Sequence, residues 1–147
     1  LAFGDMCAGL ISNYIKSRKK TLLIYYGILS VFIILFFAFK GGGSAFNMYL
    51  MCIGLGFGAG ISVLYITMSA EQFGTNLRAS AAISVPNMVR VFTPVIYFVF
   101  QLLGGDEKLP TYISAAWITG AIVMLTGFIA VLYTKETFGK EMNFVEV

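Results

Sequence analysis

The chain has 147 residues, of which 59% are hydrophobic and 12% charged, whereas about a quarter of the residues of a soluble domain are charged. Its net charge is +3, but the basic residues do not form a surface that could follow a phosphate backbone, so the sequence does not support nucleic-acid binding. It contains no His, the commonest general base and metal ligand, which argues against an enzyme. The composition therefore indicates a membrane protein.

Two cysteines, Cys7 and Cys52, both fall inside apolar segments, where a free thiol behaves as a small hydrophobic side chain. They predict neither a disulfide nor a metal site, and we expect no cofactor. The sequence begins without an initiator Met, a basic region or a cleavage site, so we expect a fragment of a longer protein rather than a signal peptide.

Long apolar runs predict four complete membrane spans and the end of a fifth. Each complete run is close to or above the roughly 20 residues that cross the hydrocarbon core of a bilayer. The expected spans are residues 1–15 (partial), 21–39, 46–70, 79–103 and 111–133. The predicted fold class is an all-α membrane protein, a polytopic bundle of transmembrane helices, followed by a tail at residues 134–147.

The basic residues divide unevenly between the two sides of the predicted bundle. If the spans alternate in direction, one side carries most of them, namely Lys16, Arg18, Lys19, Lys20, Arg78, Lys135 and Lys140. The other side carries only Lys40 and Lys108. Because positive residues gather on the cytoplasmic side, we expect a multi-pass protein of the plasma membrane (cell or inner membrane) with its C-terminus in the cytoplasm.

Gly54, Gly56, Gly58 and Gly60 are spaced by two inside the run 46–70. A dinucleotide-binding loop would need a strand before its glycines and a helix after them, so we exclude that interpretation. On a helix, these glycines form two small-x-x-x-small pairs on opposite faces, which let helices approach closely on both sides. Close packing is the favoured interpretation; the alternative is that glycine lets this helix bend or slide.

Arg90 lies in the middle of the run 79–103, where a charge costs at least a few kcal/mol and usually marks a solute path, a partner or a relay. Pro94 has no N–H to pair with the Arg90 carbonyl, so the sequence predicts a kink there. Asn87 lies one helical turn before Arg90 and shares its face. We expect a polar face near mid-membrane; the alternative is an ion pair that fixes helix packing.

We expect Asp5 and Arg90 to lie at the same depth in the membrane. About 11 residues, or roughly 16 Å of helix, separate Asp5 from Lys16 and Arg90 from Ala79. The two charges could pair directly, or both could face a shared aqueous cavity in which the carboxylate gains and loses a proton. The alternative is that Asp5 only caps or packs against a neighbouring helix.

The segment "GLISNYIKSRKK" resembles the loop signature G-x-L-x-D-R-x-G-R-R of the major facilitator superfamily. Gly9 stands at the glycine, and Arg18 and Lys19 fall in the basic run. The segment departs from the signature at three positions, with Asn13 in place of Asp, Tyr14 in place of Arg and Lys16 in place of the second Gly.

Two further segments resemble the sugar-porter-like members of that family. "EQFGTNLRASA" is similar to E-x-F-P-T-x-x-R-G-x-A, with Gly74 replacing the proline. "KETFGKEMNFVE" is similar to the family ending P-E-T-K-G-K and keeps Glu136, Thr137, Gly139 and Lys140. The resemblance implies a partial C-terminal half of a 12-helix major facilitator fold, from the end of helix 8 to helix 12.

The resemblance also implies roles for particular residues. The two loops would form a cytoplasmic gating network of Gly9, Asn13, Arg18, Glu71 and Arg78, weakened because Asn13 is neutral. It implies that helix 10 lines the central path, which makes Tyr49, Tyr65 and Thr67 candidate solute contacts. It places Asp5 and Arg90 on opposite sides of the cavity face, each with partners in the missing helices.

These observations together lead us to expect secondary active transport of a small polar solute, a sugar or an organic acid, coupled to protons by alternating access. The expected solute and proton pathway comprises Asp5, Asn87, Arg90 and Tyr65. The expected partners are the solute, H⁺, the lipid bilayer and the N-terminal helices of the same protein. The alternative is a non-transporting membrane receptor or assembly subunit derived from a transporter. We do not expect an enzyme, and the segment "AFGD" lacks the first glycine of an intramembrane G-x-G-D protease site.

Overall fold

A computed structural model describes residues 1–39, 44–104 and 109–139, and the described residues form helices and connecting turns. The helices are α1 (Ala2–Ile15), α2 (Arg18–Ala38), α3 (Ala45–Gly58), α4 (Ile61–Gln72), α5 (Arg78–Gly104) and α6 (Leu109–Tyr133). Four segments are long and apolar enough to cross a membrane: α2, α3 with α4, α5, and residues 111–133 of α6. The structure confirms the expected all-α class, with segments able to cross a membrane. Lys40, Lys108 and the tail from Lys140 lie outside the described residues.

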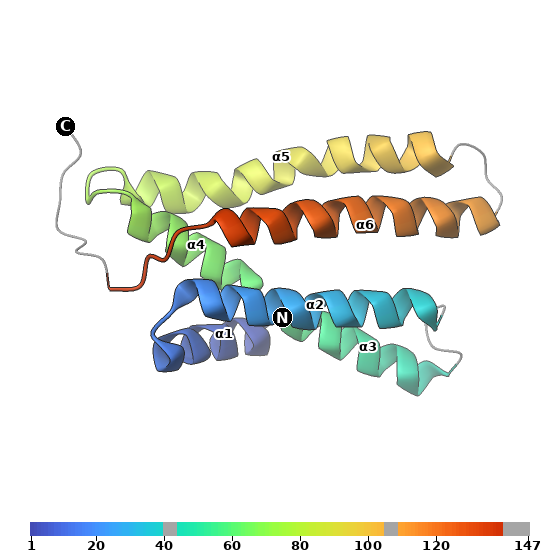
Figure 1. Cartoon of the computed structure of the whole chain (residues 1–147), viewed down its shortest axis with the longest axis horizontal. Helices are drawn as coiled ribbons and strands as arrows, with labels where there is room; N and C mark the ends of the chain where they lie inside the picture. Colours follow the sequence, from blue (N-terminus) through green and yellow to red (C-terminus); the bar gives the residue numbers. More distant parts are fainter. Residues whose placement is uncertain (40–43, 105–108, 140–147) are drawn as a thin grey trace. The chain divides into compact units, whose positions relative to one another are not determined.

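The chain divides into two compact units (Figure 1). The first comprises residues 1–82 and the segment that begins at Thr134, and the second comprises residues 83–133.

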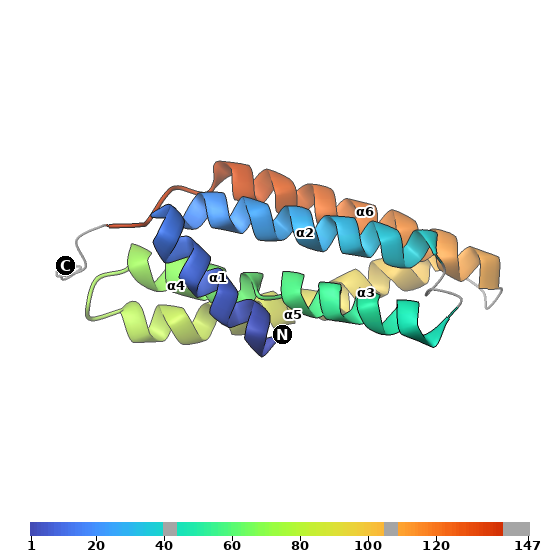
Figure 2. The same ribbon diagram turned by 90° about the horizontal axis from the view of Figure 1, so that it is seen from below.

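The first unit is built on α1 and α2, which a tight turn connects. Lys16 ends α1 in the left-handed conformation, with φ 54°, and Ser17 begins α2 by accepting a hydrogen bond from the N–H of Lys20 (3.2 Å). This is the side-chain cap that Ser favours at a helix N-terminus. Helix α1 runs obliquely to α2 (Figure 2) and packs against α2, α3 and α4. At this meeting point Tyr25 is fully buried and stacks on Phe57, with 5.4 Å between ring centroids.

The predicted span 46–70 is broken in the structure, although the sequence pattern favours one continuous run. Helix α3 ends at Gly58 and α4 begins at Ile61. Across the break the N–H groups of Gly60 and Ser62 donate to the carbonyls of Phe57 (3.0 Å) and Ala59 (3.2 Å), three residues back instead of four. Such tightened turns are common where a helix is interrupted. The apolar pattern does not reveal the break because both halves belong to one apolar run.

The glycines of α3 and of the break lie against two neighbouring helices. A Cβ added to Gly58 would lie 3.0 Å from the Leu29 Cα of α2. A Cβ added to Gly60 would lie 2.4 Å from the Gly4 carbonyl carbon of α1. The prediction that these glycines permit close packing on two faces is confirmed. Backbone atoms form the contacts at these two positions, so a larger residue would require the helices to separate.

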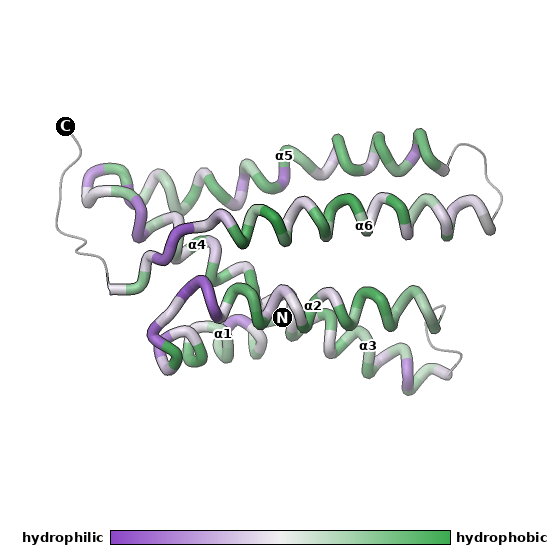
Figure 3. Tube along the Cα trace, viewed as in Figure 1, coloured by the Kyte–Doolittle hydropathy of each residue, from purple (hydrophilic) through white to green (hydrophobic). Residues whose placement is uncertain are grey.

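The second unit contains most of α5 together with α6, which run antiparallel and are both predominantly hydrophobic (Figures 1 and 3). Pro86 and Pro94 both lie inside α5, which continues through them. The two helices meet where Phe100 packs edge-on against Tyr112, with 5.4 Å between ring centroids. Van der Waals packing of this kind holds helices together where no water is present to drive association.

Candidate functional site

A polar cluster occupies one end of the first unit, where hydrophilic residues gather at the α1–α2 turn and after α6 (Figure 3). We call this cluster the Arg18 network. It comprises Ser12, Asn13, Ser17, Arg18, Glu71, Glu136, Thr137 and Phe138. Four segments contribute: the end of α1, the start of α2, the end of α4 and the segment after α6.

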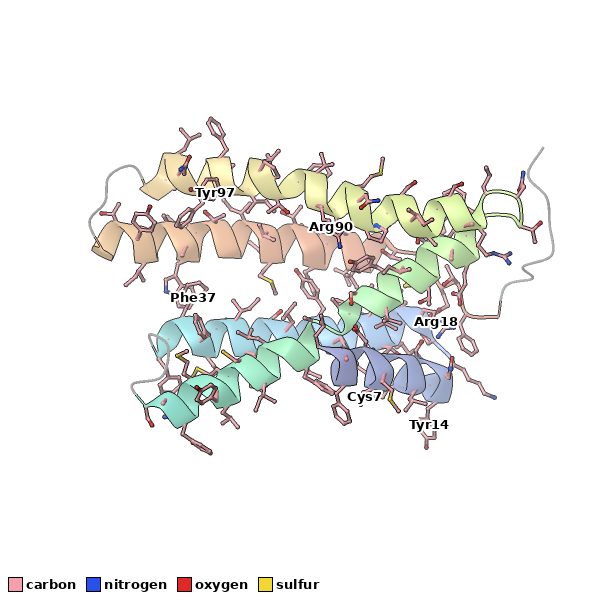
Figure 4. All side chains as sticks on the ribbon, turned by 180° about the vertical axis from the view of Figure 1, so that it is seen from behind. Cys7, Tyr14, Arg18, Phe37, Arg90 and Tyr97 are labelled. Atoms are coloured by element: carbon pink, nitrogen blue, oxygen red, sulfur yellow. The ribbon has the colours of Figure 1, made fainter. Side chains whose placement is uncertain are left out.

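Arg18 lies at the centre of the network, beside the α1–α2 turn (Figure 4). Its Nη2 and Nε atoms donate to Glu71 Oε1 at 2.9 and 3.2 Å. Its Nη1 atom donates to Ser12 Oγ (2.9 Å) and Asn13 Oδ1 (3.1 Å). The side chains of Arg18 and Glu71 are only 16% and 14% exposed, so water screens this ion pair less than an open surface pair. The planar guanidinium, with its several donors, suits this position better than a lysine ammonium.

Glu136 joins the tail to the start of α2. Its carboxylate accepts hydrogen bonds from the Ser17 hydroxyl and from the backbone N–H groups of Arg18 (2.8 Å) and Lys19 (3.2 Å). The first N–H groups of a helix lack partners within the helix and favour negative charge. Partial burial disfavours the charged carboxylate, but the hydrogen bonds from Ser17 and from the backbones of Phe138, Arg18 and Lys19 outweigh it and lower the pKa of Glu136 to about 2.

Two further tail residues contact the same ion pair. The Thr137 hydroxyl donates to Glu71 Oε2 (2.7 Å), and Thr137 is 1% exposed. The guanidinium of Arg18 lies 5.2 Å from the centre of the Phe138 ring, within range of a cation–π interaction. The tail therefore covers the Arg18–Glu71 pair and satisfies the second Glu71 oxygen.

Hydrogen bonds join Asn13, Arg18 and Glu71, three residues expected at the gating network. Gly9 lies on α1, and a Cβ added there would meet nothing within 4 Å, so no close approach requires glycine at this position. Arg78 is half-buried at the start of α5, and its backbone N–H donates to the Gly74 carbonyl (2.9 Å).

Asp5 lies where α1 crosses the break between α3 and α4. It is half-buried, and its Oδ1 atom accepts a hydrogen bond from the Ser62 hydroxyl (2.8 Å). Gly60 lies against the backbone of Gly4 and Asp5, and the Tyr25 hydroxyl donates to the Gly4 carbonyl (3.2 Å). Asp5 thus contacts α4 at its first turn, beside the break between α3 and α4.

The other expected pathway residues lie on different helices. On α5, Arg90 and Asn87 are exposed within their own unit, and the Asn87 amide donates to the Ile83 carbonyl (3.1 Å). On α4, Tyr65 is half-buried. Tyr49 lines a cavity of about 370 Å³ with Gly4, Cys52 and Phe57 among others.

The hydroxyl of Thr67 is bonded to carbonyls of its own helix, those of Val63 (2.8 Å) and Leu64 (3.0 Å). It is therefore less available to a solute than the sequence suggests, because a hydroxyl has a single proton to donate.

Sequence reasoning did not single out Ser17, Ser62 or Thr137 as site residues. Ser17 carried a local signal, since a Ser directly before an apolar run is a typical helix start. Ser62 carried no local signal, because single hydroxyl residues are common in membrane helices. Thr137 matched the ending P-E-T-K-G-K, but that resemblance gave it no role. Within the described residues, no group of three His, Cys, Asp or Glu side chains could hold a metal ion.

Comparisons with protein-family models, curated proteins and solved structures gave no match to this chain. Over residues 1–39, 44–104 and 109–139 the fold is all-α, with four segments long and apolar enough to span a membrane.

Proposed function

We propose that this chain is part of a proton-coupled secondary transporter of a small polar solute, a sugar or an organic acid, in the plasma membrane. In this proposal it forms the end of helix 8 and helices 9–12 of a major facilitator fold, and the end that carries the Arg18 network faces the cytoplasm. The loop motifs around Gly9, Glu71 and Glu136 support the family assignment.

The Arg18 network is the observation that carries the proposal. It links two interhelical loops and the tail through charged hydrogen bonds, and all three segments belong to the side that the positive-inside rule assigns to the cytoplasm. A cluster of this kind holds one end of a helix bundle closed through contacts that can break again. It breaks when the helices move apart, which alternating access requires.

The strength of the network fits a gate rather than a permanent clamp. Hydrogen bonds to charged groups contribute about 1.5–3 kcal/mol each, and exposed ion pairs about 0–1 kcal/mol. A few such interactions shift the balance between two conformations, and solute or proton binding can reverse that balance. Asn13 contributes a neutral acceptor to Arg18 (3.1 Å) where the family signature has an Asp.

Arg90 is the proposed solute contact. An Arg in a membrane-spanning helix is costly and is retained where it serves a function, and a guanidinium binds carboxylate or hydroxyl groups with several donors. Asn87 adds an amide on the same helix, one turn away. Asp5 is the proposed proton site.

The test is uptake of radiolabelled sugars and organic acids by cells that express the complete protein. Loss of a charged hydrogen bond costs about 1.5–3 kcal/mol, so Arg90→Ala should reduce uptake at least about tenfold with unchanged surface expression. Arg90→Lys should retain part of the activity. Gln101→Ala is a matched control, since Gln101 also lies on α5 and its amide donates to the Tyr97 hydroxyl of the same helix (3.0 Å). Wild-type uptake by Arg90→Ala would overturn the role assigned to Arg90.

A further inference from the structure

We infer that the groove between α5 and α6 binds the apolar body of the solute, and that the solute is an organic acid rather than a sugar. In this arrangement Arg90 holds the carboxylate at one end of the groove, and the buried hydroxyl of Thr119 donates to the same group. The inference rests on the proposed function and narrows its two solute classes to one.

The groove lies within the second unit and has a volume of about 440 Å³. Its walls are mainly hydrocarbon and include Ile96 and Phe100 of α5 and Val123 of α6. Gly120 adds width, because a Cβ added there would meet nothing within 4 Å. This volume, and an apolar lining with a few polar groups, are typical of sites that bind small molecules.

The hydroxyl of Thr119 points to a ligand that carries a hydrogen-bond acceptor. Thr119 lines the groove and is 7% exposed, and its Oγ1 atom has no hydrogen-bond partner among the described residues. Thr126 of the same helix instead donates to the Ile122 carbonyl, the usual arrangement for a Thr inside a helix. A buried hydroxyl without a partner is costly. Rotation about χ1 between the two rotamers that helical Thr adopts turns this hydroxyl toward the groove.

Thr119 lies too deep in the membrane for the polar groups of lipids to reach it. Residues 111–133 of α6 are able to cross the membrane, and Thr119 is roughly 12 Å of helix from residue 111. The hydrocarbon core is about 30 Å thick, so this hydroxyl lies near its middle. A solute bound near the bilayer midplane reaches this depth, whereas a lipid headgroup does not.

Arg90 supplies the charge that complements a carboxylate. It precedes Thr93 and Tyr97 on α5 by three and seven residues, so the three side chains share a face, and Thr93 and Tyr97 line the groove (Figure 4). Arg90 is exposed within its unit, and no carboxylate of the described residues forms an ion pair with it. A charge inside a membrane span needs a partner, and a guanidinium forms its strongest hydrogen bonds with carboxylates and phosphates.

The dimensions of the groove define the acid. Away from Arg90, Phe100 packs edge-on against Tyr112, with 5.4 Å between ring centroids, and limits the length of the groove. From Thr93 to Phe100, α5 rises by roughly 10 Å, which suits an aliphatic or aromatic carboxylate of medium length. A sugar suits this lining poorly, because most of its hydroxyls would lose their hydrogen bonds to water and find no partner.

The test is equilibrium binding of radiolabelled octanoate to the complete protein in lipid nanodiscs, after subtraction of binding to protein-free nanodiscs. 1-Octanol lacks the charge and acetate lacks the apolar body, so each should compete at least about tenfold more weakly than unlabelled octanoate. Glucose should not compete. Arg90→Ala should abolish the preference for octanoate over 1-octanol.

Two substitutions test the groove itself. Thr119→Val keeps the shape of the side chain and removes the hydroxyl, so it should weaken octanoate binding about tenfold without impairing folding, and Thr119→Ser should restore most of the affinity. Gly120→Leu fills the groove and should also weaken binding at least about tenfold. Gly27→Leu on α2 is the matched control, since a Cβ added there also meets nothing within 4 Å, and it should leave binding unchanged.

Octanoate binding that neither Thr119→Val nor Gly120→Leu changes would overturn the inference, and it would show that a lipid chain or another helix of the complete protein fills the groove. Competition by glucose, or no octanoate binding, would overturn it as well. Binding is measured without a pH gradient, so these failures leave sugar transport possible. Octanoate binding without gradient-driven uptake would instead contradict the proposed function and leave the site in place.

Discussion

Glu136 is the residue whose chemistry is most clearly set by its surroundings. Its carboxylate is held by the Ser17 hydroxyl and by backbone N–H groups at the start of α2, and its pKa falls from 4.5 to about 2. In a released tail the carboxyl would regain its ordinary pKa. The lowered pKa means that docking is stabilised fully above about pH 4.5 and that this stabilisation is lost as the pH falls toward 2.

We therefore predict that acid weakens the docking of the tail. Because Glu136 is largely exposed, screening limits its contribution to about 1 kcal/mol, or roughly fivefold in the docking equilibrium. Glu136→Gln at neutral pH should speed hydrogen exchange at the N–H groups of Arg18 and Lys19 by about that factor, as measured by mass spectrometry. Lys135→Gln, at the neighbouring position, should leave this exchange unchanged. Equal exchange in the wild type and Glu136→Gln would contradict the docking.

Lys16 adopts an unfavourable backbone conformation. It has a positive φ of 54° at the end of α1, where a residue with a Cβ pays about 1–2 kcal/mol. Glycine would adopt this left-handed conformation at lower cost. The turn forms with Lys16 because the contacts of Ser17 and Arg18 on its far side hold it in place.

The break between α3 and α4 depends on close contacts more than any other feature of the helices. Gly60 meets backbone atoms of Gly4 and Asp5, Gly54 meets the side chain of Phe32, and Gly27 of α2 has nothing within 4 Å of an added Cβ. A side chain can move aside, whereas two packed backbones must separate. The three glycines should therefore respond differently to the same substitution.

Gly60→Ala should destabilise the protein by about 1–3 kcal/mol, the usual cost of overpacking. Gly54→Ala should cost less, since the Phe32 ring can rotate, and Gly27→Ala should stabilise α2 by up to about 1 kcal/mol through helix propensity. Thermal unfolding of the complete protein in detergent measures the series. Equal midpoints for Gly60→Ala and Gly27→Ala would show that the close approach of α1 is wrong.

Most helix limits could be predicted from the sequence, but the break could not. Helices α2, α5 and α6 follow apolar runs that charged or turn residues terminate, so length and hydropathy define them. The break depends on how closely α1 packs on Gly60, and a glycine run in an apolar segment is equally compatible with a continuous helix. Arg18 and Glu71 stand out as charges in loop motifs. Ser62 stands out only when α1 is seen beside it.

Across the whole molecule, the Arg18–Glu71 pair connects segments that are far apart in sequence. We predict that a double-mutant cycle with Arg18→Ala and Glu71→Ala gives a coupling of about 1–2 kcal/mol, since the pair is mostly buried. Unfolding of the complete protein in mixed micelles measures it. Asn13→Ala should cost less than either single charge removal, because it removes one neutral acceptor. A coupling within about 0.3–0.5 kcal/mol of zero would indicate independent residues.

Proton-coupled transport by the complete protein is the central proposal. The direct measurement is uptake of a panel of radiolabelled sugars and organic acids into proteoliposomes that contain the purified complete protein, with and without an inward pH gradient. The account predicts that at least one solute accumulates above its external concentration only when the gradient is present, and that collapsing the gradient releases it. The absence of gradient-dependent flux for every solute of the panel would contradict the account.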